Sequence, residues 1–265
     1  MIIRRFLLRT AAEAVSLARV ASPLRPGLRI LMYHSVGQRA LGDTQGIFSV
    51  SQQRFRDHAR LLAGMEHCRM VPLQPLDLPE QALQVAVTFD DGYRDNLRTA
   101  APILLEHGIP FTVFVSSDFI KNRTDGFMTP EELKEIARLP GVSIGAHGKS
   151  HRPLTACSNI ELESELSGSK HYLEDLMGQP VTAVAYPYGA VDMRVRDEAA
   201  RSGYDLGVCT RFDINMPGRD PLLLCRCNIE RDDTARVLRQ KLAGNWDWYR
   251  CRTPDPALQK NPKGP

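Results

Sequence analysis

The most constraining feature of this sequence is the regular alternation of short apolar runs with segments whose apolar residues recur at helical spacing. Runs that are apolar throughout are typical of strands in a parallel sheet that helices cover. The predicted strands span residues 28–34, 85–89, 111–117, 142–147, 181–186, 205–210 and 222–229. The predicted helices span 51–65, 96–107, 158–177, 191–202 and 232–248, and one more begins after Thr129. This pattern predicts one α/β domain, either a barrel or an open wound sheet.

The composition excludes several classes of protein. Hydrophobic residues make up 43% of the chain and charged residues 25%, which excludes a globally disordered, collagen-like or coiled-coil chain. The formal net charge of +3 comes from 34 basic and 31 acidic residues without a basic stripe, so we expect no nucleic-acid partner. Six cysteines occur without a Cys-x-x-Cys pair, and we interpret them as small buried side chains in a reducing compartment.

Residues 1–27 are predicted to form a separate N-terminal amphipathic segment. Charged residues interrupt its apolar positions, so it is too polar for a membrane-spanning helix and lacks the apolar run of a cleavable signal peptide. Two alternatives remain: a helix that packs on the domain, or a basic helix that lies on a membrane surface through residues 1–25. We therefore predict a protein that is cytoplasmic or peripheral to the inner membrane, with the main domain at 28–250 and a flexible tail at 251–265.

Titratable side chains directly follow several of the predicted strands. Because the carboxyl ends of parallel strands meet at one edge of a barrel or sheet, these side chains are expected to share a site. They are His34 after the first strand, Asp90 and Asp91 after the second, His147 and His151 after the fourth, and Arg226 within the last; a Tyr-Pro-Tyr-Gly turn at 186–189 follows the fifth.

The pairs Asp90–Asp91 and His147–His151 together indicate a metal centre. Adjacent carboxylates repel each other unless a positive group or a proton lies between them, so one acid is expected at a metal and the other at a substrate water. Two histidines at this spacing with one aspartate leave coordination positions open on Zn²⁺, as a hydrolytic site requires. Taken singly, each pair has a simpler interpretation: a turn or helix cap for the aspartates, and a surface or core pair for the histidines.

The motifs around these residues resemble a known family. TFDDGY at 88–93, followed by HGKSHRPL at 147–154, resembles the NodB-homology polysaccharide deacetylases, carbohydrate esterase family four. The resemblance covers roughly residues 29–230, and the segments LMYHSV and AYPYG are similar to the branch of exopolysaccharide deacetylases. It implies a distorted (β/α) barrel with about seven strands.

The resemblance also implies an activity and a set of site residues. The activity is metal-dependent hydrolysis of N-acetyl, and sometimes O-acetyl, groups on a polysaccharide or oligosaccharide, with Zn²⁺ as the expected cofactor and an acetylated glycan as the partner. A metal-bound water would attack, with Asp90 as the general base. The implied metal ligands are Asp91, His147 and His151, and Pro187 with Tyr188 would supply the backbone N–H that holds the oxyanion.

Two departures from the family pattern bear on the remaining roles. Ala185 stands where the family often has arginine, and no histidine follows His171 to serve as the late general acid. The resemblance to the exopolysaccharide branch implies instead that His34 is the general acid and that Arg226 orients Asp90.

Both of these assignments have structural alternatives. His34 is otherwise a buried structural histidine. Arg226 follows Cys225, where the branch has proline, and is otherwise part of a salt bridge that closes the barrel. Trp246 and Trp248 are expected to pack within the last helix rather than to contact a substrate.

Two other functions fit the same residues. One is hydrolysis of another amide or ester on this fold, such as a peptidoglycan or O-acetyl sugar or a small cyclic amide. The other is a non-catalytic glycan-binding or assembly module, which the missing late histidine and Ala185 would suit. The complete set of two aspartates and two histidines favours catalysis, since a binding module does not need it. The sequence does not predict the natural glycan, the metal held in cells or the oligomeric state.

Overall fold

The computed structural model describes residues 24–74 and 82–258 of the chain. The predictions for the N-terminal segment, including its contact with a membrane surface, fall almost wholly on residues 1–23 and lie outside the described residues. Residues 259–265 of the predicted tail also lie outside the described residues.

One parallel sheet forms the centre of the fold. Its strands are β1 (Gly27–Tyr33), β4 (Cys68–Met70), β5 (Leu83–Phe89), β6 (Phe111–Val115), β7 (Val142–Ala146), β8 (Ala183–Ala185), β9 (Leu206–Val208) and β10 (Cys227–Asn228). They run in the order β10–β1–β5–β6–β7–β8–β9, with β4 paired to the first half of β5. A separate small pair joins β2 (Ser35–Val36) to β3 (Ser49–Val50). The parallel sheet confirms the predicted α/β class.

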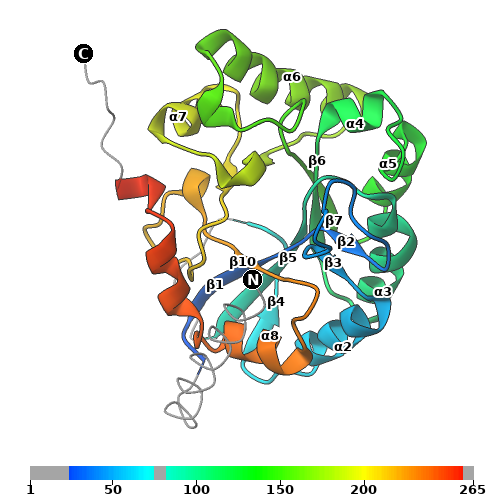
Figure 1. Cartoon of the computed structure of the whole chain (residues 1–265), viewed down its shortest axis with the longest axis vertical. Helices are drawn as coiled ribbons and strands as arrows, with labels where there is room; N and C mark the ends of the chain where they lie inside the picture. Colours follow the sequence, from blue (N-terminus) through cyan, green and yellow to red (C-terminus); the bar gives the residue numbers. More distant parts are fainter. Residues whose placement is uncertain (1–23, 75–81, 259–265) are drawn as a thin grey trace.

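Helices surround this sheet (Figure 1). They are α2 (Gln52–Ala63), α3 (Ala101–Glu106), α4 (Ser117–Lys121), α5 (Pro130–Ala137), α6 (Asn159–Met177), α7 (Met193–Arg201) and α8 (Ala235–Leu242). Local sequence fixes several starts: Ser51 caps α2, and Thr129 and Ser158 form capping boxes at α5 and α6. In a capping box, the side chains satisfy backbone N–H groups that have no partner within the helix.

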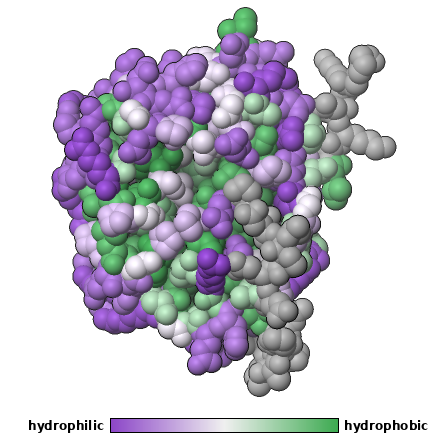
Figure 2. Space-filling model, turned by 180° about the vertical axis from the view of Figure 1, so that it is seen from behind, coloured by the Kyte–Doolittle hydropathy of each residue, from purple (hydrophilic) through white to green (hydrophobic). Residues whose placement is uncertain are grey.

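Both faces of the sheet are buried. Val85 and Val87 belong to the larger apolar cluster, while Ile30 and Ala86 belong to a second cluster on the opposite face. Strands that are apolar throughout predict this two-sided burial. The rim of the molecule is mainly hydrophilic, and apolar residues gather toward the middle of the face seen in Figure 2. Within the described residues, no helix is both long and apolar enough to span a membrane.

The sheet is curled, and the segment 224–228 lies between its two ends. Leu224 forms a parallel bridge with Val208 at the end of β9, and Cys227 pairs with Leu31 of β1. This segment therefore links the two edges of the curled sheet. The arrangement is the distorted (β/α) barrel that the resemblance implies.

The prediction of a continuous last strand at 222–229 is wrong. Only β10 at its end is a strand, and its first part is the 3₁₀ turn η4 (Pro221–Leu223). The side chain of Asn215 accepts from the Cys225 N–H at 2.7 Å and donates to its carbonyl oxygen at 2.9 Å. A side chain thus takes the hydrogen bonds that a neighbouring strand would otherwise make, which an apolar run does not reveal.

The last predicted helix, 232–248, is also shorter than expected. α8 ends before Gly244, whose φ of 81° is left-handed and typical of a helix end. Trp246 lies beyond the helix, and Trp248 lies in the 3₁₀ helix η5 (Asp247–Arg252). Their rings stack with centroids 6.4 Å apart, so the two side chains pack as expected but beyond the end of α8.

Candidate active site

The candidate residues lie where the parallel strands end. His34 directly follows β1, Asp90 and Asp91 follow β5, and His147 follows β7. The main chain joins the first two of these ends, because the Asp90 N–H donates to the Tyr33 carbonyl at 2.9 Å. The fold therefore places these predicted residues at one edge of the sheet.

Asp91, His147 and His151 form a tight cluster. Oδ1 of Asp91 lies 3.4 Å from Nε2 of His147 and 3.1 Å from Nε2 of His151. One ligand atom from each residue lies within 4.8 Å of the other two, which is close enough for all three to bind one ion. Asp91 and His147 are buried, whereas the His151 side chain is 21% exposed, so the cluster reaches solvent through His151.

The hydrogen bonding of this cluster fits a metal ion between its members. Nδ1 of His147 donates to the Ala185 carbonyl at 2.7 Å, which leaves the lone pair on Nε2, facing Asp91. Oδ1 of Asp91 is buried and has no hydrogen-bond partner among the described residues. Two buried acceptor atoms thus face each other at 3.4 Å, an arrangement that needs a cation or a proton between them. Aspartate and histidine are common ligands of Zn²⁺.

The electrostatics of the cluster keep Asp91 in the form that binds metals. Burial raises the pKa of Asp91, but contacts with His147 and His151 outweigh burial and hold that pKa well below its usual range. Burial lowers the pKa of His147, but the carboxylates of Asp90 and Asp91 outweigh it and raise that pKa overall. The same two carboxylates favour a cation in this gap, and a metal ion that binds there would displace any proton on His147.

Three residues of the site have a left-handed backbone that side chains rarely adopt. The φ angle is 74° at Asp91, 57° at His151 and 59° at Tyr188. Each such residue costs of order 1–3 kcal/mol and persists only where its surroundings fix it, which is common at ligand sites. The reversal at Asp91 lets two adjacent carboxylates reach different partners: Asp91 reaches the histidines, while Asp90 reaches Arg226.

Asp90 and Arg226 form a buried bidentate ion pair. Nη1 of Arg226 donates to Oδ1 at 2.6 Å and Nη2 donates to Oδ2 at 2.7 Å. Oδ2 also lies 4.0 Å from Nε2 of His147, so the pair is next to the metal-ligand cluster. Burial raises the pKa of Asp90, but Arg226 and His147 outweigh burial, and the pKa lies below its usual value. The carboxylate is therefore ionised and fixed in orientation.

Arg226 is itself positioned by the closure of the barrel. It lies in the segment 224–228, and its Nε donates to the Cys209 carbonyl at 3.1 Å. Its guanidinium lies over the ring of Phe114, 5.7 Å from the centroid. The ion pair joins β5 to this closing segment, so one contact both closes the barrel and orients Asp90.

His34 faces the same cluster from the end of β1. Its ring lies against Phe48 with centroids 4.6 Å apart, and its buried Nδ1 has no hydrogen-bond partner among the described residues. Burial lowers the pKa of His34 and outweighs the opposing effect of Asp91 and Asp90, so the ring is neutral. A role as general acid therefore requires that His34 gain a proton during the reaction.

Sequence reasoning missed two residues that hold the His34 loop. The Asp95 carboxylate accepts from the Val36 N–H at 3.0 Å, and the Asn96 side chain donates to the His34 carbonyl at 2.8 Å. Asn96 also begins a π-helical turn, η1 (Asn96–Ala100), and such turns are rare and often lie at functional sites. The available signal is the place of Asp95 and Asn96 just after the TFDDGY motif, but the sequence pattern there predicts only a helix that begins at Asn96.

Pro187 and Tyr188 lie in the 3₁₀ turn η3 (Pro187–Gly189) after β8. Pro187 is buried, whereas Tyr188 is 66% exposed and its ring centroid lies 4.9 Å from that of His151. The turn thus approaches the metal-ligand cluster, and the Tyr188 ring borders its solvent side.

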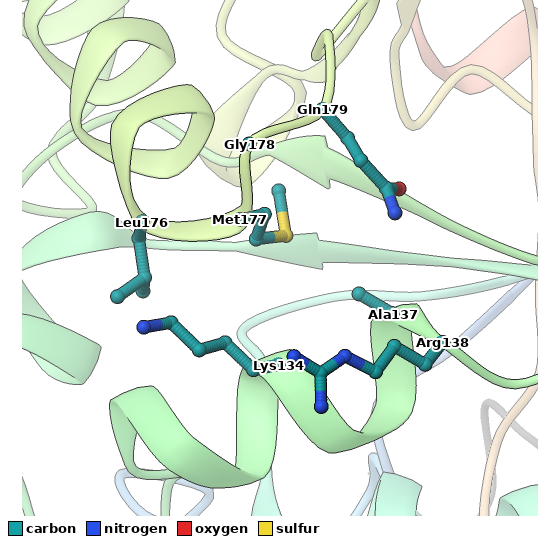
Figure 3. Close-up of a pocket in the computed structure, with 7 residues that line it drawn as sticks. All are labelled: Lys134, Ala137, Arg138, Leu176, Met177, Gly178 and Gln179. Carbon is teal, nitrogen blue, oxygen red and sulfur yellow. The ribbon is translucent and has the colours of Figure 1, made fainter.

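A separate hollow of about 190 Å³ lies between α5 and the end of α6 (Figure 3). Its lining residues are Lys134, Ala137, Arg138, Leu176, Met177, Gly178 and Gln179. None of them is a candidate site residue, and the two charged ones are basic. This hollow contains no carboxylate or imidazole for hydrolysis, so we do not assign the reaction to it.

Part of this chain matches a known protein family. A family model described as polysaccharide deacetylase matches residues 79–207, a range that contains Asp90, the metal-ligand cluster and η3 but neither His34 nor Arg226. The chain is 30% identical over 188 residues to YxkH of Bacillus subtilis (strain 168), a protein named for this same family; the match covers 69% of this chain and 64% of that protein. The chain thus spans less than two thirds of that relative and about a quarter of the other curated relatives that it matches.

Solved structures show the same fold. The deacetylase PplD of Streptococcus pyogenes, in complex with acetate, is similar with a TM-score of 0.73 and 26% identity, over 82% of this chain and 98% of that one. IcaB from Ammonifex degensii is similar in fold with a TM-score of 0.66 and 23% identity, over 84% of this chain and all of its own (100%). Together with the matched motifs and the curled parallel sheet, these findings show that the chain belongs to the polysaccharide deacetylase (NodB-homology) family.

Proposed function

We propose that this protein is a metal-dependent hydrolase that removes N-acetyl groups from a polysaccharide or oligosaccharide. The observation that carries the proposal is the Asp91–His147–His151 cluster, in which the buried Oδ1 of Asp91 has no hydrogen-bond partner among the described residues, beside an ionised and oriented Asp90. A family relative of known structure is a deacetylase that binds acetate, the product that such a reaction releases.

The cofactor in this proposal is Zn²⁺, which Asp91, His147 and His151 would hold. When bound, such an ion polarises the acetyl carbonyl and lowers the pKa of a water. The remaining tasks of the reaction fall to residues of the chain.

Asp90 is the proposed general base. Its ionised carboxylate takes a proton from the water as the water attacks the acetyl carbon. Arg226 keeps both carboxylate oxygens in a fixed orientation and holds the pKa of Asp90 below its usual value, so the base is in its working form at neutral pH.

Tyr188 and His34 are proposed to complete the reaction. The Tyr188 backbone N–H donates to the oxygen that becomes negative in the tetrahedral intermediate. His34 first takes up a proton from solvent and then donates it to the departing sugar nitrogen as the carbon–nitrogen bond breaks, and Asp90 returns its own proton to solvent. An amine leaves only when protonated, and an alcohol needs this help less. Replacing His34 by Gln should therefore slow the release of N-acetyl groups more than that of O-acetyl groups.

The test measures two quantities in one preparation of the full chain: metal content and acetate release from N-acetylglucosamine oligomers. We expect about one ion per chain and acetate release, both lost in Asp91→Ala. A bound ion without acetate release from N-acetyl or O-acetyl glycans would support a glycan-binding module instead. No ion after Zn²⁺ is supplied would refute the proposal.

Peripheral contact of residues 1–25 with a membrane surface stays a prediction. Its support is the basic, amphipathic pattern of this segment. Recovery of the full-length protein from the membrane fraction at low salt, and its release at high salt, would support that contact. Full recovery in the supernatant at low salt would contradict it.

A further inference from the structure

The loop between the two histidine ligands has a fixed but unusual shape. Gly148, Lys149 and Ser150 separate His147 from His151, and no helix or strand includes these residues. Gly148 and His151 both have positive φ, 67° and 57°, so the loop has a conformation that side chains rarely adopt. His147 is held by its own bond to Ala185, but the place of His151 relative to it depends on this loop.

A buried carboxylate from α6 holds this loop. Oε2 of Glu165 accepts from the N–H of Lys149 at 2.8 Å and from the N–H of Ser150 at 2.9 Å, and Oε1 accepts from the Ser150 hydroxyl. Glu165 is only 5% exposed. A Cβ on Gly148 would lie 3.1 Å from the same Oε2, so carboxylate and loop are in close contact.

Two backbone carbonyls of the loop are held as well. The Ser169 hydroxyl of α6 donates to the Gly148 carbonyl at 2.9 Å, and the Asp118 N–H of α4 donates to the Lys149 carbonyl at 2.9 Å. Glu165 supplies the acceptor for the N–H groups of Lys149 and Ser150. A buried carboxylate is costly unless it is hydrogen-bonded, and the hydrogen bonds that the Glu165 carboxylate accepts within the described residues come from this one loop.

We propose that Glu165 is a positioning residue that fixes His151 against His147 and thereby sets the affinity of the site for its metal. This inference rests on the proposed function, because it assumes that the cluster binds an ion. Glu165 contacts no ligand atom of the cluster; it acts through the backbone of Lys149 and Ser150.

Two substitutions of Glu165 distinguish the effect of its hydrogen bonds from the effect of its side-chain volume. Glu165→Leu keeps a similar volume but leaves both N–H groups without an acceptor, so Zn²⁺ affinity should fall about 10–100-fold, as for other outer-shell partners of metal ligands. Glu165→Gln should keep most of the affinity. The amide oxygen of Gln can accept from both N–H groups. Its NH₂ can donate to the Ser150 hydroxyl, which then rotates to act as an acceptor instead of a donor.

The experiment titrates Zn²⁺ alone into metal-free full-length protein, with a chelating dye as competitor, and checks folding by circular dichroism. Glu163→Leu, an exposed position on the same helix, is the matched control and should leave the affinity unchanged. Leu173→Ala, at a buried residue of α6, should lower thermal stability without removing an acceptor from the loop, and it should also leave the affinity unchanged. If Glu165→Leu does not fold, Glu165→Asp replaces it: it keeps the charge but is too short for both bonds, so a loss of about 10-fold is expected.

The outcomes distinguish this inference from the proposed function. If the wild-type chain binds no Zn²⁺, the proposed function fails. If the wild type binds but the folded Leu variant, or the Asp variant in its place, binds equally well, the positioning role of Glu165 is refuted. The role is also refuted if Leu173→Ala weakens binding as much as Glu165→Leu does, because general destabilisation then explains the loss.

Discussion

The two halves of the candidate site are built in different ways. The metal-ligand cluster comes from two short loops: Asp91 lies in the loop after β5, and His147 and His151 lie four positions apart in the loop after β7. The proton-transfer half consists of Asp90, Arg226 and His34. Arg226 lies 136 positions after Asp90 in the sequence, and His34 lies at the end of another strand, β1. One half depends on local sequence, and the other depends on closure of the sheet.

The same difference appears in how each half is held. The metal-ligand loops contain left-handed residues, and contacts with Ala185 and with Glu165 of α6 hold the histidine loop in place. Arg226 reaches Asp90 only because the segment 224–228 lies between β9 and β1. Changes in the first half should therefore remove metal while the fold survives, whereas changes in the second should alter stability or proton transfer while metal stays bound.

The largest expected effect is in the metal-ligand half. In His147→Ala, the site loses one of its ligands, so the bound ion should fall from about one per chain to none and acetate release should disappear. Metal content by elemental analysis, with acetate release in the same sample, checks this. His171→Ala, at an exposed histidine outside the site, should change neither. Full metal occupancy in His147→Ala would contradict the ligand assignment.

The next effect separates the two halves directly. Asp90→Asn removes the proposed base but no proposed ligand, so kcat should fall about 10²–10⁴-fold while metal content stays at the wild-type level. Steady-state kinetics and elemental analysis measure the two. Asp175→Asn, the same change at an exposed position of α6, is the control. An unchanged kcat would remove Asp90 as the base.

Much of the fold and the local half of the site can be predicted from the sequence. The strand that ends at Phe89 and the capping boxes at Thr129 and Ser158 depend on neighbouring residues, and local pattern is enough to place them. The same holds for the pairs Asp90–Asp91 and His147–His151, because each pair begins directly after an apolar strand. The resemblance to the family, which the comparisons confirm, adds the distorted barrel.

The parts that could not be predicted depend on contacts distant in sequence. The apolar run at 222–229 suggests a strand, but Asn215 takes the hydrogen bonds of Cys225, and a side chain ten residues away leaves no periodicity. Glu165 gives an equally weak signal, because a glutamate inside a helix is ordinarily a solvent-facing residue. Its function becomes visible only when the loop after β7 is seen against α6.

A smaller effect tests the half of the site that depends on closure. Arg226→Met leaves the buried Asp90 carboxylate without its partner, so the free energy of unfolding should fall by about 3–5 kcal/mol. The double variant with Asp90→Asn should recover part of this loss, because no unpaired charge remains. Urea unfolding of the metal-free proteins measures both. If the double variant loses as much stability as the two single variants together, the ion pair does not couple β5 to the closing segment.

The smallest effect concerns the carboxylate that holds the His34 loop. Burial raises the pKa of Asp95 to about 6, although hydrogen bonds from Ser35 and Val36 oppose burial. The folded protein thus binds this proton more tightly than the unfolded chain, in which the carboxyl has its ordinary pKa of 3.8. Stability from this group is fully present below the unfolded pKa and is lost as pH rises through about 6, a change of roughly 3 kcal/mol.

In the Asp95→Asn variant, the amide cannot ionise, so the loss of stability as pH rises through about 6 should be absent. The free energy of unfolding of the metal-free variant, measured by urea at pH 4, 5, 6 and 7, should fall less steeply than that of the wild type, with Asp175→Asn following the wild type. Zn²⁺ affinity should not change, because Asp95 touches the loop of His34 and not that of the histidine ligands. Parallel profiles for Asp95→Asn and the wild type would show that folding does not raise the pKa of Asp95. A loss of metal affinity in Asp95→Asn would show instead that the two halves of the site are coupled through the segment that follows Asp91.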